Sequence, residues 1–142
     1  MPMSSSYDDD IKLSLEEDIG IGQVQVEQPD KYFELIDQFF PTSMNRIDWS
    51  QVSQYDMIEF ELGDGLDKIL SFISKHIEMP LDEDVVVIGD DLIDNAYRLK
   101  SSIFFENALE FFSIPQHTYV LFPSSKKCLN LTFEGDLYFG PV

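Results

Sequence analysis

The chain has 142 residues, of which 44% are apolar and 13% aromatic, which is enough for one domain with a sizeable core and excludes global disorder. It carries 27 acidic and 9 basic residues, a formal net charge of −18. A protein that binds nucleic acid or an anionic membrane through charge needs the opposite sign, so both classes are excluded. The excess is well above the magnitude of about 2 to 8 that solubility requires of a small domain, and we expect a cationic partner.

The first third of the chain begins with a segment that we expect to be mobile. Residues 1–22 combine serines, short acidic runs and two glycines, which predicts an acidic leader ahead of one globular domain over residues 23–142. Residues 23–26 permit a brief extended stretch. Residues 30–40 place five large apolar side chains on one helical face between Pro29 and Pro41, which predicts a helix.

The middle of the chain alternates between strand and helix patterns. Residues 55–62 have a period of two, which predicts a half-buried strand with Glu59 and Glu61 on its exposed face. The apolar spacing of residues 66–77 predicts a helix that ends before Pro80. Residues 85–88 are four consecutive β-branched residues, which is typical of a fully buried central strand.

The last third is rich in aromatic residues and has a net charge of only −2, compared with −16 for residues 1–100. The pattern predicts a partial helix over 92–99, a largely buried helix over 102–112, and three short strands over 118–122, 128–133 and 137–139. Gly135 lies in the last hairpin loop, where a positive φ is expected. The element order predicts an α+β (mixed α/β) fold: a single central mixed β-sheet with about three helices and a C-terminal antiparallel meander.

The strongest enzymatic candidate is the acidic segment after the central strand. Asp90, Asp91 and Asp94 follow a strand that ends at Gly89, where carboxylates could hold Mg²⁺. Haloacid-dehalogenase-type phosphatases need an Asp-x-Asp motif on an earlier strand, which this sequence lacks, and Asp-Asp-x-x-Asp is known from all-helical prenyl-diphosphate enzymes that are far longer. The spacing of an EF-hand is also missing. We therefore favour a solvated or partner-facing acidic turn and expect no catalytic residue, no metal and no cofactor.

The remaining reactive side chains have structural explanations. His76 lies near the end of a predicted helix, where the helix dipole favours a cation. His117 stands at a strand entrance as a hydrogen-bonded residue. Cys128 has no activating environment in the sequence, so we expect a small buried packing residue. As the single cysteine it cannot form an internal disulfide, and no secretory signal or membrane span is apparent; we expect a cytoplasmic protein.

Acidic residues of the predicted strands and turns are the candidate contacts for a cationic partner. Trp49 either plugs one end of the core or serves as an aromatic anchor beside them. The predicted contact residues are Asp56, Glu59, Glu61, Asp82, Glu83, Asp84, Asp90, Asp91, Asp94 and Trp49.

The C-terminal stretches 115–122 (PQHTYVLF) and 128–140 (CLNLTFEGDLYFG) resemble the ending of small bacterial immunity proteins from polymorphic-toxin and contact-dependent growth inhibition systems. The resemblance implies a non-enzymatic monomer that forms a heterodimer with the toxin domain encoded beside it, most often a nuclease. Such a protein blocks the active site or substrate groove of the toxin. An alternative function is an acidic nucleic-acid mimic that acts on a DNA-binding or restriction protein.

Overall fold

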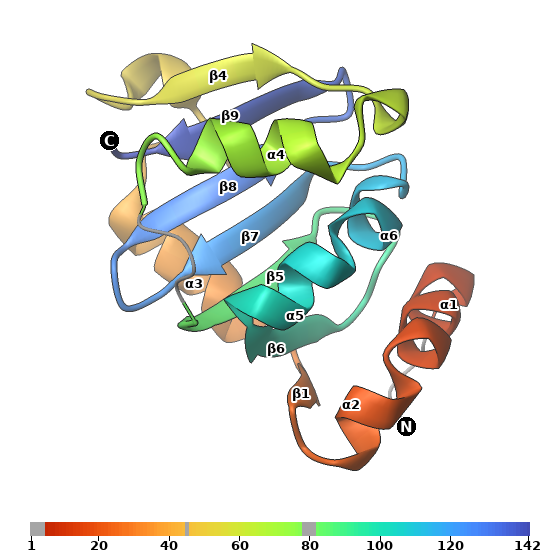
Figure 1. Ribbon diagram of the computed structural model, residues 1–142. Helices are drawn as coiled ribbons and strands as arrows, with labels where there is room; N and C mark the ends of the chain where they lie inside the picture. The colour runs from red at the N-terminus through yellow and green to blue at the C-terminus, as the bar shows by residue number, and fades with distance from the viewer. Residues whose placement is uncertain (1–4, 45, 78–81) are drawn as a thin grey trace.

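A seven-stranded antiparallel sheet forms the middle layer of the protein (Figure 1). The computed structural model describes residues 5–44, 46–77 and 82–142. The strand order is β1-β6-β5-β7-β8-β9-β4, and a small second sheet pairs β2 with β3. The strands are β1 (Val24–Glu27), β2 (Thr42–Ser43), β3 (Arg46–Ile47), β4 (Asp56–Glu59), β5 (Asp84–Gly89), β6 (Ala96–Lys100), β7 (Thr118–Phe122), β8 (Lys127–Leu131) and β9 (Asp136–Gly140).

Helices cover both faces of this sheet (Figure 1). The α-helices are α1 (Ser6–Ser14), α2 (Glu16–Gly20), α3 (Asp30–Phe39), α4 (Leu66–Ile73), α5 (Ser101–Glu106) and α6 (Ala108–Phe112). Helices α4, α5 and α6 lie on one face and α3 on the other. Two short 3-10 turns, Trp49–Gln51 and Leu62–Asp64, precede β4 and α4.

The central strands are apolar throughout because each of their faces meets a different core. Val85 and Val87 belong to the cluster under α4, α5 and α6, whereas Val86 and Ile88 belong to the cluster under α3. All four side chains are fully buried. A strand covered on both faces has no exposed face on which polar residues could alternate, which explains the continuous β-branched run.

The α+β fold class and the C-terminal antiparallel meander β7-β8-β9 are confirmed. Gly135 has the expected positive φ, of 93°. The sheet differs from the mixed arrangement expected from sequence, since every neighbouring pair of its strands is antiparallel. The reason lies in residues 92–99, where the structure has β6 rather than a partial helix; β6 returns directly beside β5 as a hairpin partner.

Two further predictions are corrected within the described residues. Residues 5–22 are not a loose leader: they form α1 and α2, and Ile11 and Leu15 are buried in the core beside α5 and α6. The helix expected over 102–112 is two helices, which meet at Asn107. The Asn107 side chain donates to the carbonyl of Ile103 at 2.9 Å and so competes with the backbone pattern of a continuous helix.

One buried carboxylate attaches α1 to the rest of the domain. Asp8 is fully buried and accepts hydrogen bonds from the backbone N–H of Asp94 at 2.7 Å, from that of Asn95 at 3.3 Å and from the hydroxyl of Tyr97. It also completes a capping box with Ser5 at the start of α1. Burial alone would raise the pKa of Asp8, but these hydrogen bonds outweigh it and hold the pKa below its usual value.

We expect Asp8→Ala to lower the free energy of unfolding by about 3 kcal/mol, because it leaves buried donors unpaired in addition to removing the cap. Urea denaturation measures this change. The matched control is Asp10→Ala, an exposed residue of the same helix, which should change stability by less than about 0.5 kcal/mol. Equal stability of the two variants would show that Asp8 does not hold α1 in place.

Candidate functional site: the acidic end of the sheet

The register of the sheet brings several loops to one end. Gly89 pairs with Thr118, Thr118 with Leu131, and Glu59 with Asp136. The ends of β4, β5 and β8 therefore lie beside the starts of β6, β7 and β9, on the right of the sheet in Figure 1. We call this the acidic end, because its strand ends and loops contain Glu59, Glu61, Asp90, Asp91, Asp94, Glu134 and Asp136.

The predicted contact residues do not all lie there. Asp82, Glu83 and Asp84 precede or begin β5, and Asp56 begins β4, so these four lie at the opposite end of the sheet. They belong to a different surface from the five predicted residues of the acidic end. The single acidic surface expected from sequence is therefore divided in two.

Each of the four acidic residues at the opposite end has a partner within the fold. Asp84 forms ion pairs with Lys100 at 3.0 Å and Arg98 at 3.6 Å. Asp82 accepts from the hydroxyl of Ser102 at 2.8 Å, and Glu83 from that of Ser124 at 2.6 Å. These contacts join the start of β5 to β6, α5 and the loop after β7, so we assign these carboxylates a structural role.

Asp56 is also engaged. Its Oδ2 lies 2.9 Å from Nε2 of His76, and this hydrogen bond holds the pKa of Asp56 below its usual value. Asp56 does not share an exposed face with Glu59, because residues three apart in a strand point to opposite sides. The position of His76 is explained without the helix dipole, because its ring stacks on that of Phe139 and is hydrogen-bonded to the Asp56 carboxylate.

Trp49 is part of the core and not a surface anchor. Its side chain is only 6% exposed, and its ring stacks on Tyr138 with centroids 5.0 Å apart. The indole Nε1 donates to Oδ1 of Asn130 at 2.9 Å, which satisfies its one polar atom inside the protein. Of the two roles considered for Trp49, the structure therefore supports packing at one end of the core.

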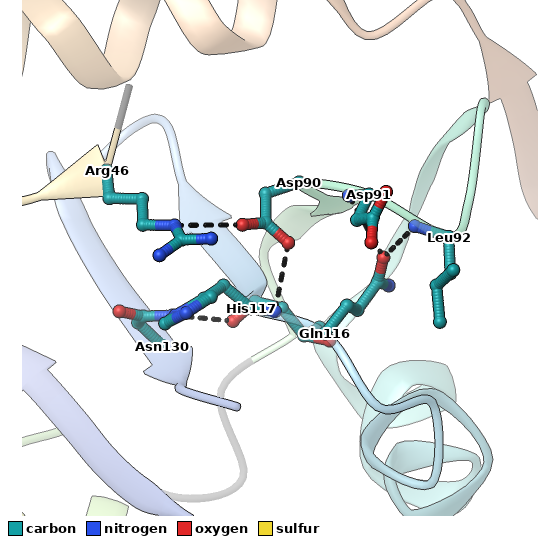
Figure 2. Close-up of polar contacts among 8 residues, drawn as sticks. Arg46, Asp90, Asp91, Leu92, Gln116, His117 and Asn130 are labelled. Atoms are coloured by element: carbon teal, nitrogen blue, oxygen red, sulfur yellow. Dashed lines mark hydrogen bonds and ion pairs between the residues drawn. The ribbon is translucent and has the colours of Figure 1, made fainter. Parts of the chain in front are cut away.

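Asp90 organises the acidic end (Figure 2). One carboxylate oxygen accepts the backbone N–H of His117 at 3.0 Å, and the other accepts Nε of Arg46 at 3.0 Å. Asp90 is thus a positioning residue whose charge is already paired. The ion pair also links the β2-β3 segment to the end of β5, a contact that the sequence pattern did not indicate.

Gln116 is a second organising residue that sequence reasoning missed. Its side chain lies directly over Gly89, where an added Cβ would come within 2.5 Å of the amide. Its Oε1 accepts the backbone N–H of Leu92 at 2.7 Å (Figure 2). Residue 89 must therefore be glycine, because a side chain there would clash with the Gln116 amide. The hydrogen bonds accepted by Gln116 and by Asp8 hold the β5-β6 loop at two points.

Three predicted carboxylates remain available to a partner. Asp91 and Asp94 project from the held loop, and Glu59 ends the edge strand β4. All three are exposed, and among the residues that the structure describes their side chains have no hydrogen bond or ion pair. Glu61 is exposed beside them in the turn before α4. Glu134 is equally exposed at this end, and the hairpin position next to Gly135 was the signal that could have identified it.

The one cysteine side chain, that of Cys128, is buried in the core. Burial raises the pKa of the Cys128 thiol, so the sulfur stays protonated. In residues 5–44, 46–77 and 82–142, no three His, Cys, Asp or Glu side chains are placed to hold a metal ion together. Over the same ranges, no helix has the length and apolar character needed to cross a membrane.

His117 makes a pH-dependent contribution to this end. His117 is only 8% exposed, and this burial lowers the pKa of its imidazole from the usual 6.5, although the negative charge of Asp90 opposes the shift. The unfolded chain takes up a proton near that value while the folded protein does not. Folding stability is therefore full above pH 6.5 and falls as pH decreases from there toward the lowered pKa of the folded state.

We expect His117→Gln to remove this part of the pH dependence. The free energy of unfolding of the wild-type protein should decline between about pH 7 and pH 5, whereas that of the variant should decline less, since glutamine does not titrate. Urea denaturation at several pH values measures the difference. Parallel profiles for the two proteins would contradict this role of His117.

No protein-family model matches this chain, and no curated protein matches it either. Its function is therefore inferred from its own geometry.

Proposed function

We propose that this protein is a non-enzymatic immunity protein that acts in the cytoplasm. It binds a cationic toxin domain, most simply a nuclease, and covers the active site or substrate groove with its acidic end. The observation that carries the proposal is the contrast between the two ends of the sheet. Carboxylates at the opposite end are bonded within the fold, whereas Glu59, Asp91 and Asp94 are exposed without partners among the described residues.

Charge complementarity explains why such a surface suits a nuclease. A nuclease groove attracts phosphates and is therefore basic, and carboxylates can occupy it in place of phosphates. Opposite charges also accelerate encounter, toward about 10⁸ M⁻¹s⁻¹ at low salt. Rapid capture matters for an inhibitor that must act before the toxin does.

The acidic loop is also held in advance of binding. Asp8 accepts the backbone N–H of Asp94, and Gln116 accepts that of Leu92, so the loop that carries Asp91 is fixed at two points. A surface that is ordered before it binds loses less conformational entropy in the complex. Rigid presentation supports an interface more than it supports a merely solvated turn.

The test uses the product of the gene next to that of this chain as the candidate toxin. We expect the full chain to restore growth to cells that express the candidate toxin, and the purified pair to form a complex. Neutralising Glu59, Asp91, Asp94 and Glu134 together, to Gln or Asn, should slow association about tenfold or more at about 50 mM salt and much less at about 200 mM salt. Stopped-flow measurements give both rates.

The matched control neutralises four exposed carboxylates that lie on helices and not in the strand ends and loops of the acidic end, namely Glu16, Glu17, Glu34 and Glu106, and so changes the net charge equally. We expect it to protect cells and to associate almost as fast as the wild-type protein. Failure to protect or to bind would overturn the proposal, as would an affinity that salt does not change. Competition with DNA for several unrelated basic proteins would instead identify a nucleic-acid mimic.

A further inference from the structure

A hollow with an apolar floor lies beside the acidic end. Its floor contains Phe60, Phe112 and Leu131, which are buried, and its rim contains Leu62 and Phe133. The rim side chains are 48% and 65% exposed. Two large exposed apolar side chains around one depression are a stronger indication of a binding surface than apolar residues scattered singly.

The hollow is built from three segments that are distant in sequence. The residues after β4, the residues after α6 and the end of β8 form its walls. The backbone N–H of Phe60 donates to the carbonyl of Gly135 at 2.8 Å, which fixes the first wall to the β8-β9 turn. The rings of Phe60 and Phe112 meet edge to face with their centroids 6.1 Å apart, which fixes the first wall to the wall formed by the residues after α6. The depression is therefore part of the packed structure.

Its volume is about 140 Å³. An apolar cavity of about 150 Å³ accommodates benzene, so the space suits one aromatic ring or one branched aliphatic side chain. A drug-sized ligand needs a pocket of about 300 Å³ or more. The size therefore favours a single side chain of a protein over a small-molecule ligand.

The charges around the hollow are of one sign. Glu61 precedes the rim residue Leu62, and Glu134 follows the rim residue Phe133; both glutamates are exposed. None of the residues that line the hollow is Lys or Arg. The nearest cation in sequence, Lys68, is already paired with Asp64 at 3.0 Å. A side chain that enters the hollow would thus have its chain neighbours beside carboxylates.

We propose that this hollow is the anchor site for the toxin: it takes one aromatic or branched aliphatic side chain that is flanked in the toxin sequence by Lys or Arg. The inference rests on the proposed function and adds the chemistry of the partner. Exposed ion pairs contribute little affinity each, whereas an apolar side chain buried in a central pocket and ringed by polar contacts contributes much of it. The carboxylates then set the rate of encounter, and the hollow sets the lifetime of the complex.

The test replaces Leu62 and Phe133 with Ser, singly and together, and measures association and dissociation with the candidate toxin defined above. We expect the double variant to dissociate about tenfold faster or more at both salt concentrations, with little change in association rate. Its unfolding transition should match that of the wild-type protein, because both side chains are exposed. Leu13→Ser is the matched control, an equally apolar residue of α1 that is 70% exposed and does not line the hollow; its complex should dissociate at the wild-type rate.

The outcomes separate the two proposals. If the wild-type protein binds the candidate toxin and the double variant dissociates no faster than Leu13→Ser, the anchor inference is overturned while the proposed function stands. If either single variant changes the unfolding transition, the other provides the comparison. If the wild-type protein does not bind the candidate toxin, the proposed function fails, and the anchor inference fails with it.

Discussion

The structure depends on one constraint: both faces of the central strands of the sheet are removed from water. Val85 to Ile88 are fully buried, with α4, α5 and α6 on one side and α3 on the other. A charge placed within such a strand would lose its hydration without a partner to compensate. Among the described residues, acidic side chains other than the buried, hydrogen-bonded Asp8 consequently lie at strand ends, in loops and on helix surfaces, even in a chain with a net charge of −18.

The antiparallel order of the strands then decides which loops become neighbours. Because every neighbouring pair is antiparallel, the ends of β4, β5 and β8 fall beside the starts of β6, β7 and β9, and carboxylates from separate parts of the chain come together there. At one end Arg98 and Lys100 are placed to neutralise Asp84. The neighbouring Asp82 and Glu83 accept hydrogen bonds from serine hydroxyl groups. At the other end Arg46 pairs with Asp90, whose carboxylate already accepts a backbone N–H. Glu59, Asp91 and Asp94 are thus left exposed at this end without a partner among the described residues, and a depression with an apolar floor lies beside them.

Buried polar groups make the acidic end a fixed surface. Asp8 and Gln116 approach the β5-β6 loop from α1 and from the segment before β7, and each accepts backbone donors that would otherwise be unpaired. Neither side chain could contact a partner, since both are almost completely buried. Their effect on binding would be indirect, through the position of the loop that carries Asp91 and Asp94. This separation of positioning residues from contact residues is consistent with the proposed role as an inhibitor.

The sequence by itself determined the α+β class, most of the helices and strands, the positive φ of Gly135 and the burial of Cys128, because these follow from local periodicity and from side-chain type. It did not reveal β6 or the place of α1. The apolar residues at 92, 93, 96, 97 and 99 also fit a helical spacing, and α1 is held by Asp8, a residue type that sequence analysis assigns to the surface. Which acidic residues are free was decided by tertiary structure alone. Asp84 and Asp91 are the same residue type in similar acidic surroundings, and only the strand pairing places Arg98 and Lys100 beside the first and leaves the second exposed. Whether a carboxylate is paired depends on through-space distances of a few ångströms, and those distances are set by contacts between segments far apart in the chain.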